Sequence, residues 1–97
     1  MQGDNSFIAH EKNKARDLRK SQWWKRKCSK GLCGYCGKNV SPKKLTMDHI
    51  VPISRGGRTT RGNVKPACKS CNTKKKTMLT FEWQEYIDSQ KNGKSCL

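Results

Sequence analysis

Residues 33–36 read Cys-Gly-Tyr-Cys, and residues 68–71 read Cys-Lys-Ser-Cys. These two Cys-x-x-Cys pairs decide the fold, because each pair can present two thiolates to one ion. Four thiolates complete the tetrahedron that a structural Zn²⁺ prefers, with Zn–S bonds of about 2.3 Å. Such a site leaves no coordination position open, so its expected role is to hold the domain together. The alternative is four buried or disulfide-linked cysteines. The predicted zinc ligands are Cys33, Cys36, Cys68 and Cys71.

The size of the chain makes such a metal site useful. Its 97 residues form one domain at most, and only 32% of them are hydrophobic. A chain this short buries a modest share of its surface and commonly needs a metal or disulfides. The first residues lack the apolar core of a signal peptide, so we expect a cytoplasmic chain whose reduced cysteines favour metal. Cys28 and Cys96 fall outside both pairs, and we expect no metal role for either.

The charge of the chain indicates a polyanionic partner. Its 22 Lys and Arg residues against 7 Asp and Glu residues give a net charge of +15. Between Leu18 and Phe81 the only carboxylate is Asp48. Scattered cations alone would indicate a solvated surface, but solubility does not require removing all but one acid from so long a stretch. We therefore expect contact with nucleic acid. No stretch approaches the ~20 apolar residues of a membrane span, so no membrane partner is expected.

The order of structural signals predicts an α+β domain, with a hairpin followed by a helix. Residues 1–27 are basic and read as a helical or flexible arm. Trp23-Trp24 would pack this arm on the domain or, less often, stack on unpaired bases. A strand is expected over residues 45–51, a second at 62–65 and a helix at about 68–78. Thr80 is the expected N-cap of a last helix that ends near Gly93 and closes the core. The expected division is 1–27, 28–78 and 79–97.

Asp48 and His49 are the candidate chemical pair inside the loop that the zinc would close. Neighbouring side chains on a strand point to opposite faces, so the two residues can have different tasks. Asp48 is a hard oxygen ligand suited to Mg²⁺ or Mn²⁺. His49 is a suitable general base near neutral pH. Taken alone, His49 would read as a hydrogen-bonded structural histidine, but the sole central carboxylate stands beside it.

A longer pattern surrounds this pair and resembles a known family. It runs Cys33-x2-Cys36, Met47-Asp48-His49-Ile50-Val51-Pro52, Ser54-Arg55-Gly56-Gly57, Asn63-Val64 and Pro66-x-Cys68-x2-Cys71-Asn72-x2-Lys75. Over about residues 28–78 it is similar to the HNH endonucleases that carry a zinc-binding cysteine quartet. The third signature position, often histidine, is asparagine here, which is the HNN variant. The resemblance implies the small ββα-metal fold (His-Me finger, treble-clef-like) with a structural zinc and flanking helices.

The resemblance also implies a role for each signature residue. His49 would be the general base that activates a water, and Asp48 would bind a catalytic Mg²⁺ or Mn²⁺. Asn63 would hold the loop between the strands and help to orient the histidine, although an ordinary turn asparagine is the alternative. Asn72 would be the second metal ligand, and its amide oxygen is weaker than imidazole but acceptable to these ions. Lys75 would neutralise phosphate oxygens in the cleft or anchor the DNA backbone.

The implied activity is metal-dependent hydrolysis of DNA phosphodiester bonds. The protein would nick or cleave double-stranded DNA with little sequence preference, leaving 5′-phosphate and 3′-hydroxyl ends. The alternative is a non-catalytic, zinc-stabilised module that only binds nucleic acid. Such a module needs the cysteines and cations alone, so the signature residues favour the enzyme. The cations expected to contact DNA are Lys74, Lys75, Lys76, Arg55, Arg58 and Arg61.

Overall fold

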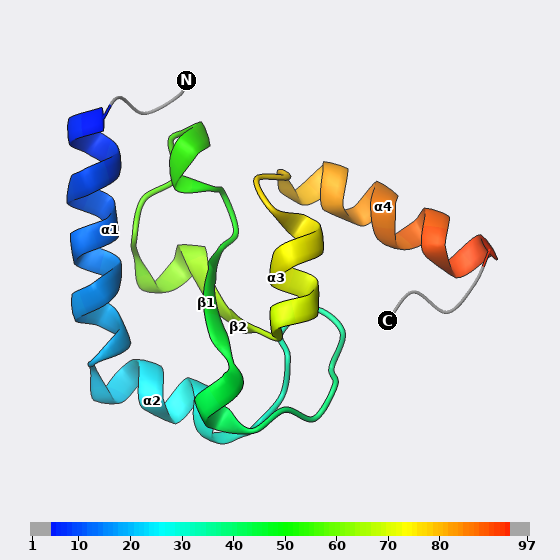
Figure 1. Ribbon diagram of the computed structural model, residues 1–97, viewed down its shortest axis with the longest axis horizontal. Helices are drawn as coiled ribbons and strands as arrows, with labels where there is room; N and C mark the ends of the chain where they lie inside the picture. The colour runs from blue at the N-terminus through cyan, green and yellow to red at the C-terminus, as the bar shows by residue number, and fades with distance from the viewer. Residues whose placement is uncertain (1–4, 94–97) are drawn as a thin grey trace.

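A two-stranded hairpin lies between two pairs of helices (Figure 1). The computed structural model describes residues 5–93. The elements are helices α1 (Asn5–Arg19) and α2 (Gln22–Ser29), strands β1 (Thr46–His49) and β2 (Val64–Ala67), and helices α3 (Lys69–Lys75) and α4 (Thr80–Gly93). Single 3-10 turns at Pro42–Lys44, Ile53–Arg55 and Arg61–Asn63 lie in the connections. The predicted α+β class, with a hairpin, a following helix and flanking helices, is confirmed.

The hairpin is antiparallel, in a register that places His49 opposite Val64. The predicted first strand ends early, at His49, because the N–H of Val51 bonds to the side chain of Asn63 at 2.9 Å instead of to a strand. The predicted second strand begins late, at Val64, because residues 61–63 form a 3-10 turn. Both corrections lengthen the connection between the strands, which carries Arg55 and Arg58.

The two faces of β1 look toward different helices. Thr46 and Asp48 contact side chains of α3. Met47 packs against the core beside α2, and His49 hydrogen-bonds a loop threonine that is itself bonded to α1. This alternation is what an extended strand requires. The predicted placement of Asp48 and His49 on opposite faces is therefore confirmed.

The two N-terminal helices pack against the hairpin. Ser21 begins α2 by accepting a hydrogen bond from the N–H of Trp24 at 3.2 Å. Trp24 is only 5% exposed and packs with Cys28, Leu45 and Val64. Residues 5–27 are therefore mostly helical, and Trp24 attaches them to the hairpin as the packing alternative predicted. Cys28 is a core residue of the same cluster.

Helix α3 is shorter than predicted at its C-terminal end. Cys68 is the N-cap, and its sulfur accepts a hydrogen bond from the N–H of Cys71. The helix ends at Lys75 instead of near Met78, because Lys76 has a φ of 49°, a value that no α-helical residue adopts. The short helix still buries Cys71 and, one turn later on the same face, Lys75.

Helix α4 closes the core over the cysteines. Its first residue is Thr80, so the predicted N-cap at Thr80 is wrong by one position. The carboxylate of Glu82 accepts the N–H of the preceding Leu79 at 2.7 Å, which satisfies a donor that the helix leaves unpaired. Trp83 is buried beside the cysteines, and the edge of its ring meets Tyr35 at a centroid distance of 5.6 Å. The predicted role of this helix in closing the core is thus what its packing shows.

Two predicted segments reach beyond the residues that the structure describes. The predicted tail beyond Gly93, with Cys96, lies outside the described residues, as do residues 1–4 of the predicted arm. Within residues 5–93, no helix is long and apolar enough to cross a membrane.

Replacing Trp24 by alanine tests whether the N-terminal helices are part of the fold. We expect the free energy of unfolding to fall by about 3–5 kcal/mol, the range for removing a buried aromatic side chain. Urea unfolding at a fixed zinc concentration measures this loss. Trp23→Ala is the matched control, because Trp23 is half-buried at the edge of the same cluster, with Lys27 and Arg61 over its ring. Its expected cost is about 1 kcal/mol. Equal losses in the two variants would show that α2 does not anchor on the hairpin.

Candidate functional site

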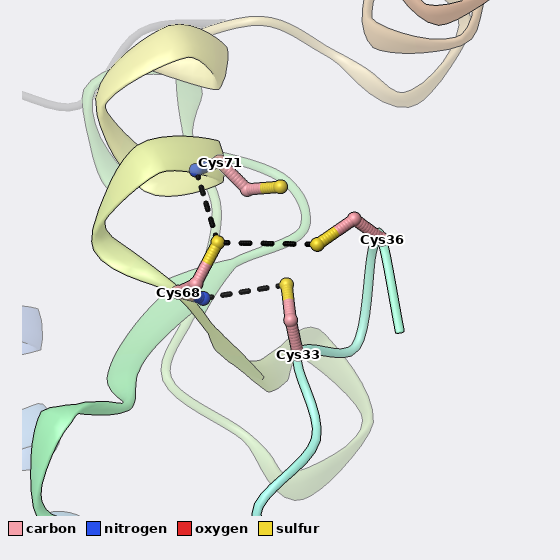
Figure 2. A group of neighbouring side chains, drawn as sticks. All are labelled: Cys33, Cys36, Cys68 and Cys71. Atoms are coloured by element: carbon pink, nitrogen blue, oxygen red, sulfur yellow. Dashed lines mark hydrogen bonds between the residues drawn. The ribbon is translucent and has the colours of Figure 1, made fainter. Parts of the chain in front are cut away.

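Four cysteine sulfurs gather where the loop after α2 meets the start of α3 (Figure 2). All four lie within 4.8 Å of one another, and the sulfurs of Cys36 and Cys68 are 4.0 Å apart. A tetrahedron with Zn–S bonds of 2.3 Å has edges of about 3.8 Å, so this spacing is close to that of a filled site. The predicted ligands Cys33, Cys36, Cys68 and Cys71 are therefore brought together as one metal-binding group.

Backbone N–H groups prepare the sulfurs to act as ligands. Cys33 accepts hydrogen bonds from the N–H groups of Tyr35 at 3.4 Å and Cys68 at 3.3 Å. Burial alone would raise the pKa of the Cys33 thiol, but backbone N–H donors lower it to about 7. Burial raises the pKa of Cys36 and of Cys71, so those thiols keep their protons until a cation binds. Binding of the cation then displaces the protons. Four sulfur donors, three of them from buried cysteines, fit a soft or borderline ion and not Mg²⁺ or Ca²⁺.

A close backbone approach docks the first cysteine pair on β2. The N–H of Gly34 donates to the carbonyl of Pro66 at 2.7 Å. A Cβ at Gly34 would stand 2.8 Å from that same carbonyl oxygen, so only glycine fits. The cysteine group is therefore joined to the hairpin by backbone contact as well as by sulfur.

His49 faces the N-terminal side of the hairpin. Its Nε2 lies 2.9 Å from the hydroxyl of Thr59, which in turn donates to the carbonyl oxygen of Glu11 at 2.9 Å. Burial lowers the pKa of His49 below its ordinary value, and the charges of Asp48 and Glu11 oppose that effect. The imidazole is therefore neutral at pH 7, which is the state that a general base needs.

Asp48 faces α3 and is almost fully enclosed, with 5% of its surface exposed. Its Oδ2 accepts a hydrogen bond from the hydroxyl of Tyr35 and lies 3.2 Å from the ammonium nitrogen of Lys75. Burial and the bond to Asp48 raise the pKa of Tyr35, so the phenol stays protonated and donates. The charge of the carboxylate is thus balanced inside the protein.

Lys75 lies inside the domain, whereas the sequence predicted a cation that faces phosphate. It is 1% exposed, and its ammonium also donates to the carbonyls of His49 at 3.1 Å and Ile50 at 3.3 Å. A buried carboxylate demands a partner charge, and Lys75 supplies it from the facing helix. In this arrangement the ammonium is not at the surface where it would anchor DNA.

The two signature asparagines hold different parts of the site. Asn63 donates to the carbonyls of Val51 at 3.1 Å and Arg58 at 2.8 Å, and accepts the N–H of Val51 at 2.9 Å, so it holds the loop between the strands. Asn72 donates to the hydroxyl of Thr46 at 2.8 Å. Asn72 therefore lies across the same space between β1 and α3 that Asp48 enters.

A carboxylate and an amide facing one space suit a hard divalent cation. Asp48 on β1 and Asn72 on α3 supply these two kinds of donor, so their chemistry suits the predicted ion. The Oδ2 oxygen of Asp48 is already shared by Tyr35 and Lys75. A divalent ion would therefore use the other carboxylate oxygen or displace the Lys75 ammonium.

The remaining cations predicted to contact DNA differ in their exposure and in their partners within the protein. Arg55 forms an ion pair with Glu82 of α4 at 2.8 Å. Arg58 lies over the ring of Phe7 at 5.5 Å, and Arg61 over the ring of Trp23 at 5.2 Å. These two arginines are exposed, as is Lys76, whereas Lys74 is half-buried. Further exposed cations on α2, which sequence reasoning did not single out as DNA contacts, are Lys25, Arg26 and Lys27.

Sequence reasoning missed Tyr35, which contacts Asp48, and Thr59, which contacts His49. It also missed Glu11, which holds Thr59. Tyr35 stands between two cysteines, so a place close to the metal group could have been inferred, but its bond to Asp48 could not. Thr59 and Glu11 carry no local signal, because Glu11 sits in a polar helical segment far from His49 in the chain. Only the packing of α1 on the loop brings them together.

Replacing Cys71 by serine tests the four-sulfur site. We expect loss of bound zinc and of the folded state, because structural zinc contributes about 10–16 kcal/mol to the folding of small zinc domains. Metal analysis and circular dichroism measure the two effects. Cys28→Ser is the control and should keep the wild-type zinc content, since Cys28 lies in the other core cluster. A folded Cys71→Ser protein without metal would contradict a structural role for the site.

Replacing Lys75 by methionine tests the buried ion pair. The change leaves the Asp48 carboxylate enclosed without its cation, so we expect the free energy of unfolding to fall by about 3–5 kcal/mol. Denaturant unfolding at fixed zinc concentration provides the measurement. Lys76→Met is the matched control, because Lys76 is exposed, and it should change stability by less than about 0.5 kcal/mol. Similar values for both variants would mean that Lys75 does not compensate Asp48.

The sequence of this chain is similar to sequences of known proteins. Residues 33–77 match the family model described as HNH endonuclease. The chain is also 32% identical over 98 residues to a Bacillus subtilis (strain 168) protein named "SPbeta prophage-derived putative HNH endonuclease YoqL". That alignment covers 90% of this chain but 40% of the relative, so the chain spans well under half of the relative's length. Residues 33–77, with their four-cysteine group, are thus the segment of this chain that belongs to the HNH endonuclease family.

Proposed function

We propose that this protein is a metal-dependent endonuclease that hydrolyses phosphodiester bonds in DNA, with His49 as the general base. The observation that carries the proposal is His49, held through Nε2 by Thr59 and next in the chain to the only carboxylate between Leu18 and Phe81. A purely structural histidine needs neither that carboxylate nor its placement on the opposite face. Membership of the HNH endonuclease family supports the same reaction class.

In this reaction His49 accepts a proton from the attacking water. Its hydrogen bond to Thr59 fixes the ring, and its lowered pKa keeps the second ring nitrogen free to accept the proton at pH 7. Asp48 and Asn72 would hold a Mg²⁺ or Mn²⁺ ion, which supplies positive charge to the phosphate and the leaving oxygen. Asn63 keeps the loop after β1 closed, so the end of the strand that carries His49 is held in place.

The cysteine group would hold a structural zinc. Its four sulfur donors suit Zn²⁺, and it fixes the first turn of α3, the helix that carries Asn72 and Lys75. A zinc at this site has no open position, so it shapes the catalytic face without taking part in the reaction.

The substrate that the charge supports is DNA, bound chiefly through its phosphates. A net charge of +15 gives strong, salt-dependent attraction to nucleic acid that does not depend on base sequence. Exposed Arg58 and Arg61 lie on the loop that also carries Thr59, the partner of His49. Cations on the same loop as the partner of His49 can contact phosphates without reading nucleobases, which suits a double-stranded substrate cut with little sequence preference.

A second function has one observation in its favour. Asp48 is enclosed and neutralised by Lys75 and Tyr35. If no divalent ion displaces this pairing, the protein is a zinc-stabilised module that binds nucleic acid and does not cut it. The two functions differ in whether DNA is cleaved, since both predict binding.

A plasmid assay with the two histidine variants tests the proposal. We expect the zinc-loaded wild type to nick or linearise supercoiled DNA with Mg²⁺ or Mn²⁺, and His49→Ala to be slower by about 10²- to 10⁴-fold. His10→Ala is the matched control and should cut like the wild type, because His10 is exposed on α1. DNA binding, measured in parallel, should persist in both variants. Undiminished cutting by His49→Ala would refute the base, and binding without any cutting would favour the module.

A further inference from the structure

The hydroxyl of Thr59 lies between the proposed base and helix α1. Thr59 is 6% exposed, and Glu11, the α1 residue that it meets, is 0% exposed. The hydroxyl has two partners at 2.9 Å: the carbonyl oxygen of Glu11 and the Nε2 atom of His49. The contact with Glu11 is buried, and the contact with His49 is partly buried.

The number of available protons fixes which atom donates and which accepts in each of these hydrogen bonds. A carbonyl oxygen can only accept, so the single hydroxyl proton of Thr59 is donated to Glu11. The hydroxyl oxygen must then accept from His49, which requires a proton on Nε2. A neutral imidazole carries one N–H, so the lone pair that can accept a further proton is on Nδ1.

Glu11 holds Thr59 at a second point. Its Oε1 accepts the backbone N–H of Thr59 at 2.5 Å, while its main-chain carbonyl accepts the hydroxyl. Its other oxygen, Oε2, is buried without a hydrogen-bond partner, and the nearest cation is Lys14 at 3.6 Å. Burying a carboxylate lowers the stability of a fold. Here the buried carboxylate of Glu11 fixes the position of Thr59.

We propose that Thr59, clamped by Glu11 of α1, is a positioning residue that holds His49 in the tautomer with Nδ1 as the proton acceptor. The catalytic consequence rests on the proposed nuclease function, whereas the tautomer itself does not. Glu11 lies in α1, outside residues 33–77, the segment that matches the family. A helix outside that segment therefore helps to position the proposed general base. The N-terminal helices are therefore part of the catalytic unit as well as of the fold.

Nitrogen NMR of the ring of His49 tests the tautomer without any cleavage. The zinc-loaded protein is labelled with ¹⁵N-histidine, and His10→Gln removes the signals of the other histidine. At a pH where the ring is neutral we expect the proton on Nε2 and an unprotonated Nδ1. A proton on Nδ1 in the wild-type fold would overturn the proposal, whatever the protein does to DNA.

Substitution of Thr59 tests the catalytic consequence. Thr59→Val keeps the shape but removes the hydroxyl, and it should lower kcat about tenfold to a hundredfold with little change in KM. Thr59→Ser keeps the hydroxyl and should remain within a few-fold of the wild type. Thr60→Val, at an exposed neighbouring position, should cut like the wild type.

The outcomes of these substitutions separate positioning from stability. Melting curves show whether each variant is folded at the assay temperature. If Thr59→Val is unfolded, the NMR experiment on the protein that retains Thr59 still decides the tautomer. Full kcat in folded Thr59→Val, or an equal loss in Thr59→Ser, would overturn the positioning role. A wild type that binds but never cuts DNA would remove the proposed function, while the position of the His49 proton would still stand or fall by the NMR result.

Discussion

The four-sulfur group is the constraint on which the rest of the structure depends. A two-stranded hairpin with a short helix has little apolar surface to bury, and a hydrophobic fraction of 32% cannot make up the difference. The sulfurs join the loop at residues 33–36 to the first turn of α3, and Trp83 closes the core over them. Because α3 is fixed there, Lys75 is delivered to Asp48 one turn further on. The metal group thus determines which side chains face β1.

Strand alternation then divides the chemistry between two sides of one strand. Asp48 points toward α3, where its charge is balanced by Lys75 and by the hydroxyl of Tyr35. His49 points toward the N-terminal helices, where Thr59 engages one ring nitrogen. Neighbouring residues in sequence therefore sit in separate environments, one ionic and enclosed, the other neutral. That separation lets a charged ligand and an uncharged base stand next to each other in the chain.

The spacing of the sequence was enough to predict the parts of the site that depend on local geometry. The cysteine quartet, the hairpin, the helix that follows it and the opposite faces of Asp48 and His49 all follow from short-range rules. The contacts that depend on tertiary packing could not be predicted this way. Glu11 and Thr59 are 48 positions apart, and no local pattern connects them. Lys75 was assigned to phosphate because it follows Cys71 by one helical turn and Asn72 by three residues. Only the burial of Asp48 reveals that Lys75 is needed inside the domain. Strand ends shifted because the side chain of Asn63 takes over hydrogen bonds that a longer strand would have made.

In the proposed reaction a divalent ion, distinct from the zinc proposed for the cysteine group, acts with His49 to cut DNA. The most direct test follows supercoiled plasmid over time with the zinc-loaded protein, with and without added Mg²⁺ or Mn²⁺, at zinc levels confirmed by metal analysis. We expect nicked or linear product only when Mg²⁺ or Mn²⁺ is present, with the zinc content unchanged. Equal cutting without the added ion, or bound but intact plasmid in its presence, would contradict it.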